Sequence, residues 1–303
     1  MNRIQLWMEA MRAPFFLASA LSATLGTGAA AFLGYRIDWL AGVLTLVGLV
    51  AVHAGANLAN DYFDHTSGND WSGPKRSPFS GGSRMIQRGI LTARAVLAAS
   101  LILFAFGGAL GLVVAVRARS WEIIALGFAG CALSLFYTAP PLRFAYRGLG
   151  ELTIGTTFGP LPTLGAYLAQ GHGFSWYPVF IGIPAGLLVA MILFANEFTD
   201  IEMDSAVGKR NLVVRLGARL ASKIYVAGGL GVSVSLVCLC LAGLMPASGL
   251  AALAATPVFF VVGKKLASNE LPSLISASGL HILTHHMVTA WLTIAFFTGR
   301  LSK

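Results

Sequence analysis

The sequence predicts an all-α membrane protein, and two observations support this before any motif is considered. Of the 303 residues, 56% are hydrophobic and only 11% are charged, and the mean hydropathy is +0.74. A soluble domain carries roughly 25% charged residues, so this chain cannot cover itself with polar surface in water. The apolar residues also gather in runs of roughly 20, the length that a helix needs to cross a bilayer. We therefore expect a polytopic bundle of about nine membrane-spanning helices.

Nine segments are long and apolar enough to be spans, and they follow one another closely. They cover residues 13–34, 38–60, 93–116, 121–138, 150–169, 177–198, 221–243, 246–263 and 276–298. Gly and Ala are abundant within them, which allows helices to pack closely in a membrane.

The basic residues predict the orientation of these spans. With the N-terminus in the cytoplasm, the cytoplasmic segments contain Arg3, Arg12, Lys75, Arg76, Arg84, Arg88, Arg94, Arg143, Arg147, Lys209, Arg210, Arg215, Arg219, Lys223, Lys264 and Lys265. The other side contains Arg36, Arg117, Arg119, Arg300 and Lys303. This bias predicts a protein of the bacterial inner membrane whose longest polar loops, 61–92 and 199–220, are cytoplasmic. The net charge of +9 is explained by this placement, so we expect lipid and no nucleic acid as a partner.

Most of the twelve carboxylates lie in two clusters, each directly after an apolar span. The first cluster contains Asn57, Asn60, Asp61, Asp64 and Asp70, and the second contains Asn196, Glu197, Asp200, Glu202 and Asp204. Positions i, i+4 and i+7 or i+8 share one face of a helix. Asn57, Asp61 and Asp64 should therefore share a face, as should Asn196, Asp200 and Asp204. His53 lies on the first face, where we expect it to line the site or to form a hydrogen bond.

The spacing of the two clusters suggests an internal repeat. Asp61 and Asp200 are 139 residues apart, and Asp64 and Asp204 are 140 apart. Each cluster ends the second span of a four-span block, so both should face the same side of the membrane. We expect one domain, 1–303, made of two pseudo-repeats, 13–138 and 150–263, and a last helix.

Carboxylates gathered at a membrane edge repel one another unless a cation neutralises them. Mg²⁺ prefers oxygen and takes one or two carboxylates together with substrate phosphates. Asp61, Asp64, Asp200 and Asp204 are thus candidate ligands for Mg²⁺ ions that bridge a diphosphate, and each cluster could also be a solvated helix end. Lys75, Arg84, Lys209 and Arg210 follow the clusters closely and could bind a diphosphate directly, although positive-inside anchoring also explains basic residues there. Arg143 and Tyr146, in a third segment on the same side, are further candidates.

Three segments resemble the UbiA superfamily of intramembrane aromatic prenyltransferases. They are NxxNDxxD at Asn57–Asp64, NExxDxExD at Asn196–Asp204 followed by GKRNLVVRLG, and YTAPPLR with the later GLGE. DYFDHTSGND is more similar to the branch that prenylates 1,4-dihydroxy-2-naphthoate for menaquinone than to the 4-hydroxybenzoate branch, which has a further aspartate where Gly68 stands.

The resemblance implies nine helices around a central cavity, with a cytoplasmic cap over a diphosphate site. It implies that Asp61, Asp64, Asp200 and Asp204 bind Mg²⁺, and we expect Asn57, Asn60 and Asn196 to orient the metal or the diphosphate. The implied substrates are an allylic prenyl diphosphate and an aromatic quinone precursor.

Two alternatives remain open on the sequence. A family member could use 4-hydroxybenzoate, homogentisate, a tetrapyrrole or a glycerol lipid as acceptor. A transporter or cation channel would also place carboxylates in a bundle, although transporters often have inverted repeats with sites at the midplane. His281, His285 and His286 resemble a metal cluster but have no acidic neighbour in sequence, so we interpret them as packing residues, with acceptor binding as the alternative.

Overall fold

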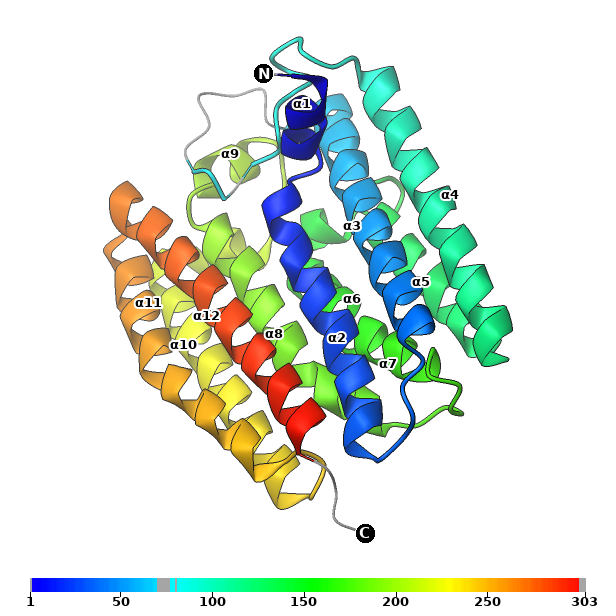
Figure 1. Ribbon diagram of the computed structural model, residues 1–303. Helices are drawn as coiled ribbons and strands as arrows, with labels where there is room; N and C mark the ends of the chain where they lie inside the picture. Colours follow the sequence, from blue (N-terminus) through cyan, green and yellow to red (C-terminus); the bar gives the residue numbers. More distant parts are fainter. Residues whose placement is uncertain (1, 70–76, 80, 300–303) are drawn as a thin grey trace.

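The structure, a computed structural model, describes residues 2–69, 77–79 and 81–299, and every regular element in these ranges is helical. Figure 1 shows the long helices side by side in one bundle, with the two chain termini at opposite ends. The prediction of an all-α fold is therefore confirmed.

The described residues of the first half of the chain form five α-helices and one 3₁₀ turn. They are α1 (Arg3–Ala10), η1 (Ala13–Phe15), α2 (Phe16–Phe32), α3 (Trp39–Ser67), α4 (Ala93–Ala118) and α5 (Glu122–Leu135). The long α3 begins where the Asp38 side chain accepts a hydrogen bond from the Ala41 amide, and it ends at Gly68, whose φ is +80°. Gly tolerates this left-handed conformation, so the helix stops there and not at the last apolar residue.

As far as residue 299, the second half contains seven α-helices and two 3₁₀ segments. They are η2 (Phe144–Arg147), α6 (Gly150–Phe158), α7 (Pro160–Leu168), α8 (Tyr177–Glu197), α9 (Ile201–Ala206), α10 (Leu212–Leu241), η3 (Ala247–Ala255), α11 (Thr256–Ser268) and α12 (Leu271–Thr298). Figure 1 shows the short α9 at the same end of the bundle as α1.

The number of nine spans is not confirmed. Within the described ranges, seven helical segments are long and apolar enough to cross a membrane, and the predicted fourth and fifth spans are not among them. The fourth is α5, which has only 14 residues. The fifth is interrupted at Gly159, whose φ of −120° and ψ of −95° are not helical, and the next residue is Pro160. Proline cannot donate the backbone hydrogen bond that would continue α6, so α7 begins as a new helix.

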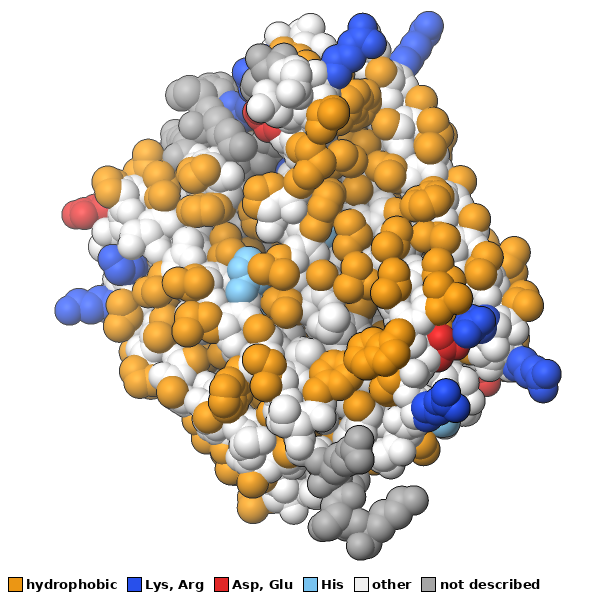
Figure 2. All heavy atoms as spheres, in the orientation of Figure 1, with side chains coloured by type: hydrophobic (Ala, Val, Ile, Leu, Met, Phe, Trp, Pro, Cys, Tyr) orange, Lys and Arg blue, Asp and Glu red, His pale blue; other side chains and the backbone are white. Residues whose placement is uncertain are grey.

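Much of the outer surface of the bundle is apolar, as expected of a protein surrounded by lipid. Figure 2 shows hydrophobic side chains over the long face of the bundle and charged side chains mainly toward its two ends. Phe128 of α5 is 81% exposed, and many other large apolar side chains are also exposed. Such an exposed apolar area is far larger than a soluble monomer tolerates, and the protein is therefore integral to a membrane.

The largest buried cluster of apolar side chains joins α2 with α8, α10, α11 and α12. Here α8 packs directly on the break between α6 and α7, because Gly159 faces the backbone of Gly182 and Gly186 without side chains between them. This close packing positions the N-terminal half of α8, and the second acidic cluster follows at the other end of the same helix.

Candidate active site

The first acidic cluster lies at the C-terminal end of α3, where Asp61 and Asp64 are each only 4% exposed. Asp61 accepts a hydrogen bond from Arg12 Nη2 at 2.9 Å, and the Ser83 amide lies 3.1 Å from both of its carboxylate oxygens. The Ser83 hydroxyl also donates to Asp61. Asp64 accepts from the hydroxyl of Tyr146 at 3.3 Å. Both carboxylates are thus removed from bulk water but supplied with donors.

The second acidic cluster surrounds the short helix α9. Asp200 accepts from the Gly81 amide and from Thr199 Oγ1, each at 3.2 Å. Asp204 is 3% exposed, and it accepts from Asn211 Nδ2 at 2.7 Å and pairs with Lys209 Nζ at 3.2 Å.

Residues 77–84, which we call the bridging segment, contact both clusters. Its residue 80 lies outside the described ranges. The Phe79 carbonyl accepts from Asn196 Nδ2 at 3.2 Å, the Gly81 amide donates to Asp200, and Ser83 donates to Asp61. Because one short segment contacts α3, α8 and the start of α9, the two clusters lie at the same end of the bundle and border the same site.

Lys209 links the clusters electrostatically. Burial alone would lower the pKa of its ammonium group, but the charge of Asp204 and then that of Asp64 hold the pKa well above its usual range. Lys209 is therefore a fixed cation between a carboxylate of each cluster. Burial and, after it, the charge of Asp64 raise the pKa of Tyr146 to about 12, so this hydroxyl stays protonated and can donate to Asp64.

Of the other predicted substrate-binding residues, some lie beside the acidic clusters and some do not. Arg84 is buried with Nη2 3.7 Å from Met203 Sδ, close to the second cluster. The guanidinium of Arg143 lies 5.5 Å from the centre of the Tyr146 ring, a cation–π contact beside Asp64. The side chain of Arg210 is exposed, and its backbone amide donates to the Tyr146 carbonyl at 3.2 Å. Lys75, like Asp70, lies outside the described residues.

Several residues of the site had no role assigned from the sequence. Arg12 and Ser83 are far from Asp61 in the chain, so no helical spacing could connect them with it. Glu151 and Glu197 are buried close to each other, and Glu197 also lies near Lys209. The Oε2 atom of each has no hydrogen-bond partner within the described part of the chain. Their positions in the GLGE and NE segments were the only available signal.

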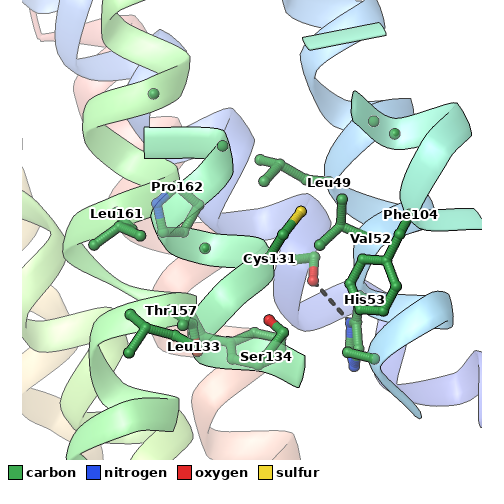
Figure 3. A pocket seen from close by; sticks show the side chains of 18 of the residues that line it. Leu49, Val52, His53, Phe104, Cys131, Leu133, Ser134, Thr157, Leu161 and Pro162 are labelled. Carbon is green, nitrogen blue, oxygen red and sulfur yellow. Dashed lines mark hydrogen bonds between the residues drawn. The ribbon is translucent and has the colours of Figure 1, made fainter. Parts of the chain in front are cut away.

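A cavity of about 740 Å³ extends from the acidic end into the bundle, where residues of each helix from α2 to α8 line it. Its polar end contains Arg12, Asn57, Asn60 and Asn196, and most of the remaining wall is apolar. Figure 3 shows part of this wall, formed by side chains that include Leu49, Val52, Phe104 and Leu161. Leu112 of α4 and Phe128 of α5 line the cavity and are also exposed on the outer surface, so the cavity wall reaches the lipid-facing side there.

The three histidines of α12 do not gather around a site. His281 is buried, with Nδ1 2.6 Å from the Tyr225 hydroxyl and Nε2 2.8 Å from the Leu188 carbonyl. These two bonds join α12 to α10 and α8, which favours the packing interpretation. His285 is also buried, and its Nδ1 lies 3.2 Å from Thr289 Oγ1 of the same helix.

The oxygen atoms of the site fit a hard divalent cation that shares its coordination with a substrate. In the described residues, no three His, Cys, Asp or Glu side chains form a complete set of metal ligands. The Oδ1 atoms of Asn60 and Asn196 are buried and have no hydrogen-bond partner there, beside the carboxylates of both clusters. Because Mg²⁺ needs only one or two protein carboxylates when phosphates and waters complete its shell, this partial set suits it.

The bundle is apolar outside, and a buried site with acidic and basic side chains lies beside an apolar cavity. This combination defines the class of protein: an intramembrane enzyme for a molecule with a charged head group and an apolar body. Residues 19–297 match the UbiA prenyltransferase family, and the chain belongs to this family and is a prenyltransferase.

Two curated relatives are similar over most of the chain. The 1,4-dihydroxy-2-naphthoate octaprenyltransferase of Mycobacterium tuberculosis is 33% identical over 98% of both chains. The 2-carboxy-1,4-naphthoquinone phytyltransferase of Synechocystis is 33% identical over 73% of this chain and 69% of the relative. The family predicted from the three motifs is thus confirmed, and these relatives support its naphthoate branch.

The fold is also that of solved UbiA homologues. The apo homologue from Aeropyrum pernix K1 matches with a TM-score of 0.70 at 16% identity, covering 91% of this chain and 97% of that chain. The homologue from Archaeoglobus fulgidus bound to GPP and Mg²⁺ matches with a TM-score of 0.69 at 15% identity, covering 97% of this chain and 99% of that chain.

Proposed function

We propose that this prenyltransferase moves a polyprenyl group from an allylic prenyl diphosphate to 1,4-dihydroxy-2-naphthoate, in a reaction that depends on Mg²⁺. The observation that carries the proposal is the joining of both acidic clusters by the bridging segment at the polar end of the apolar cavity. A diphosphate head and an isoprenoid tail need this combination of neighbouring environments.

Asp61, Asp64, Asp200 and Asp204 would hold Mg²⁺, and Asn57, Asn60 and Asn196 lie at the cavity's polar end to orient the head group. When bound, Mg²⁺ would neutralise negative charge on the departing diphosphate as a Lewis acid. Lys209 adds a fixed positive charge, and Arg84 lies close enough to contribute a second. Charges held in place before the reaction stabilise a developing anion without reorganisation.

In the reaction, the allylic C–O bond breaks and the diphosphate leaves with the electron pair. The apolar cavity wall keeps water from the allylic cation that remains. A carbon of the electron-rich aromatic ring then attacks the terminal prenyl carbon. Loss of a proton, or of CO₂ where that ring carbon bears the carboxylate, restores aromaticity.

The naphthoate acceptor is supported by the M. tuberculosis relative, whose name gives this substrate and whose sequence matches along nearly the full chain. The A. fulgidus homologue bound to GPP and Mg²⁺ supports the prenyl diphosphate and the metal. The positive-inside bias supports the bacterial inner membrane, with the site open to the cytoplasm.

The test uses purified protein with a prenyl diphosphate, Mg²⁺ and a panel of acceptors that includes 4-hydroxybenzoate and homogentisate, with products identified by mass spectrometry. We expect prenylated product from the naphthoate, and we expect EDTA to stop turnover without changing the melting temperature. Asp61→Asn should lower kcat/KM by at least roughly 100-fold, because charge stabilisation at the leaving group is lost.

The matched control is Asp38→Asn, which changes the carboxylate at the other end of α3, where Asp38 pairs with Arg117. It should keep the wild-type rate. Normal turnover in both Asp61→Asn and Asp200→Asn would contradict the site. Product from a different acceptor alone would replace the naphthoate and leave the prenyltransferase chemistry in place.

A further inference from the structure

One polar side chain inside the cavity has no part in the diphosphate site. His53 is on α3, eight residues before Asp61, and it lines the cavity while being only 9% exposed. Its Nδ1 lies 2.8 Å from the Ser19 hydroxyl of α2, the bond that is drawn as a dashed line at His53 in Figure 3. Its Nε2 has no hydrogen-bond partner among the described residues.

The surroundings of His53 are apolar and aromatic. The Phe158 ring meets the imidazole edge to face at 4.7 Å between centroids, and the Phe16 ring does so at 5.5 Å. A nitrogen in such surroundings can gain a hydrogen bond only from a molecule inside the cavity. The Ser19 bond fixes the ring, so the second nitrogen is held in one orientation for a partner that the described residues do not supply.

We propose that His53 Nε2 binds a ring hydroxyl of the aromatic acceptor, an inference that rests on the proposed function. Eight residues of helix separate His53 from Asp61 by about 12 Å along the axis. This leaves space for the diphosphate at the acidic end and the terminal prenyl carbon beneath it, with the aromatic ring at the level of His53. Phe158, which also lines the cavity, would then pack against the acceptor ring.

A hydroxyl fits this position better than a carboxylate does. A hydroxyl both donates and accepts, so it can bond Nε2 whichever ring nitrogen carries the proton. Burying a carboxylate among apolar side chains would cost much more. The acceptor's carboxylate is better placed toward Arg12, the cation at the cavity's polar end.

A purely structural role makes a different prediction. The Ser19–His53 bond joins α2 to α3, so its loss could lower stability and weaken all ligands equally. A role in acceptor binding instead weakens the acceptor selectively, and only through one hydroxyl.

The experiment measures dissociation constants of wild type and His53→Leu for 1,4-dihydroxy-2-naphthoate, 1-hydroxy-2-naphthoate and 4-hydroxy-2-naphthoate, under reducing conditions. For wild type, one of the two monohydroxy analogues should bind roughly tenfold more weakly than the dihydroxy acceptor, the effect of one lost hydrogen bond. In His53→Leu that difference should disappear, while the affinity for geranyl diphosphate with Mg²⁺ stays unchanged. His53→Gln, which keeps a polar nitrogen, should restore part of the difference and serves if the Leu variant does not fold.

His286→Leu is the matched control, because His286 is a half-buried histidine of α12, away from the cavity wall. It should keep the wild-type pattern. If the hydroxyl dependence survives in both His53 variants, or is absent from wild type, His53 does not bind the acceptor hydroxyl. If wild type does not bind the naphthoate at all while still binding geranyl diphosphate, the naphthoate assignment fails together with this inference.

Discussion

Lys209 provides a buried positive charge that balances carboxylates of the site. Its ammonium group is 3.2 Å from Asp204, and the two side chains are only 15% and 5% exposed. A buried pair of this kind contributes little by its presence, but removing one member leaves an uncompensated buried charge. Lys209 is therefore important for stability because its loss would leave the buried carboxylate of Asp204 without its cationic partner.

We predict that Lys209→Met lowers the free energy of unfolding by about 3 kcal/mol at neutral pH, because Asp204 loses its buried partner. The folded-state pKa of Lys209 is raised above its unfolded value of about 10.4, so this contribution is present in full below about pH 10. It is lost as pH rises through the folded-state pKa.

Thermal unfolding in detergent from neutral to strongly alkaline pH checks this prediction. The difference between wild type and variant should narrow only at the alkaline end. Lys223→Met, at an exposed position on α10, is the control and should change stability little. A difference that narrows already near neutral pH would contradict the role given to Lys209.

At the residue scale, the sequence predicted best what helical spacing determines. Asp61 and Asp64 were found because positions three or four apart share a helix face. Arg12 could not be found in this way, because it contacts Asp61 from 49 positions away and its charge also fits membrane anchoring. The assignment of the four aspartates as metal ligands stays a prediction until turnover of the variants is measured.

At the scale of the element, helices extend further than apolar composition indicates. The predicted second span ends at residue 60, whereas α3 continues to Ser67, because backbone bonding continues through polar residues until Gly68 allows a stop. Similarly, α10 begins at Leu212, nine residues before the predicted span at 221, with a kink at Gly217. Asp61 and Asp64 consequently lie on a helix and not on a loop.

The break between α6 and α7 yields a prediction about packing. Gly159→Ala would place a methyl group against the α8 backbone at Gly182 and Gly186, and we expect a loss of about 1–3 kcal/mol of stability. Gly165→Ala on α7 is the control, because a Cβ there meets no atom within 4 Å. Melting temperatures in detergent measure both. Equal melting temperatures for the two variants would mean that α8 does not depend on the close approach at the break.

At the scale of the whole molecule, orientation in the membrane is the property to test. In a variant whose three cysteines are replaced by alanine, Arg88→Cys and Arg119→Cys place thiols at exposed positions toward opposite ends of the bundle. We expect a membrane-impermeant maleimide to label Arg119→Cys in intact cells and Arg88→Cys only in inverted vesicles. The reverse pattern would place the acidic site outside the cytoplasm.

The sequence predicted well those features of the architecture that depend on overall composition. It predicted less well the features that depend on single residues. The all-α membrane bundle follows from hydropathy alone. The interruption of the fifth span depends on one Gly-Pro pair, Gly159 and Pro160. The residues around this pair are apolar, so hydropathy alone does not indicate the break. The internal repeat of residues 13–138 and 150–263 stays a prediction, since it rests on the spacing of two clusters.

The length of α3 determines at what depth the enzyme works. Trp39, at its first turn, is largely exposed, as befits an anchor at one membrane boundary. Asp61 follows 22 residues later, about 33 Å further along the axis, which is close to the thickness of the hydrocarbon layer. A substrate held at Asp61, as we propose, would keep its head group at the membrane surface while its tail extends through the apolar cavity toward the lipid. The enzyme would then meet its isoprenoid substrate by diffusion within the membrane plane. We therefore expect the turnover rate to depend on the surface density of the isoprenoid in the leaflet and not on its concentration in the bulk solution.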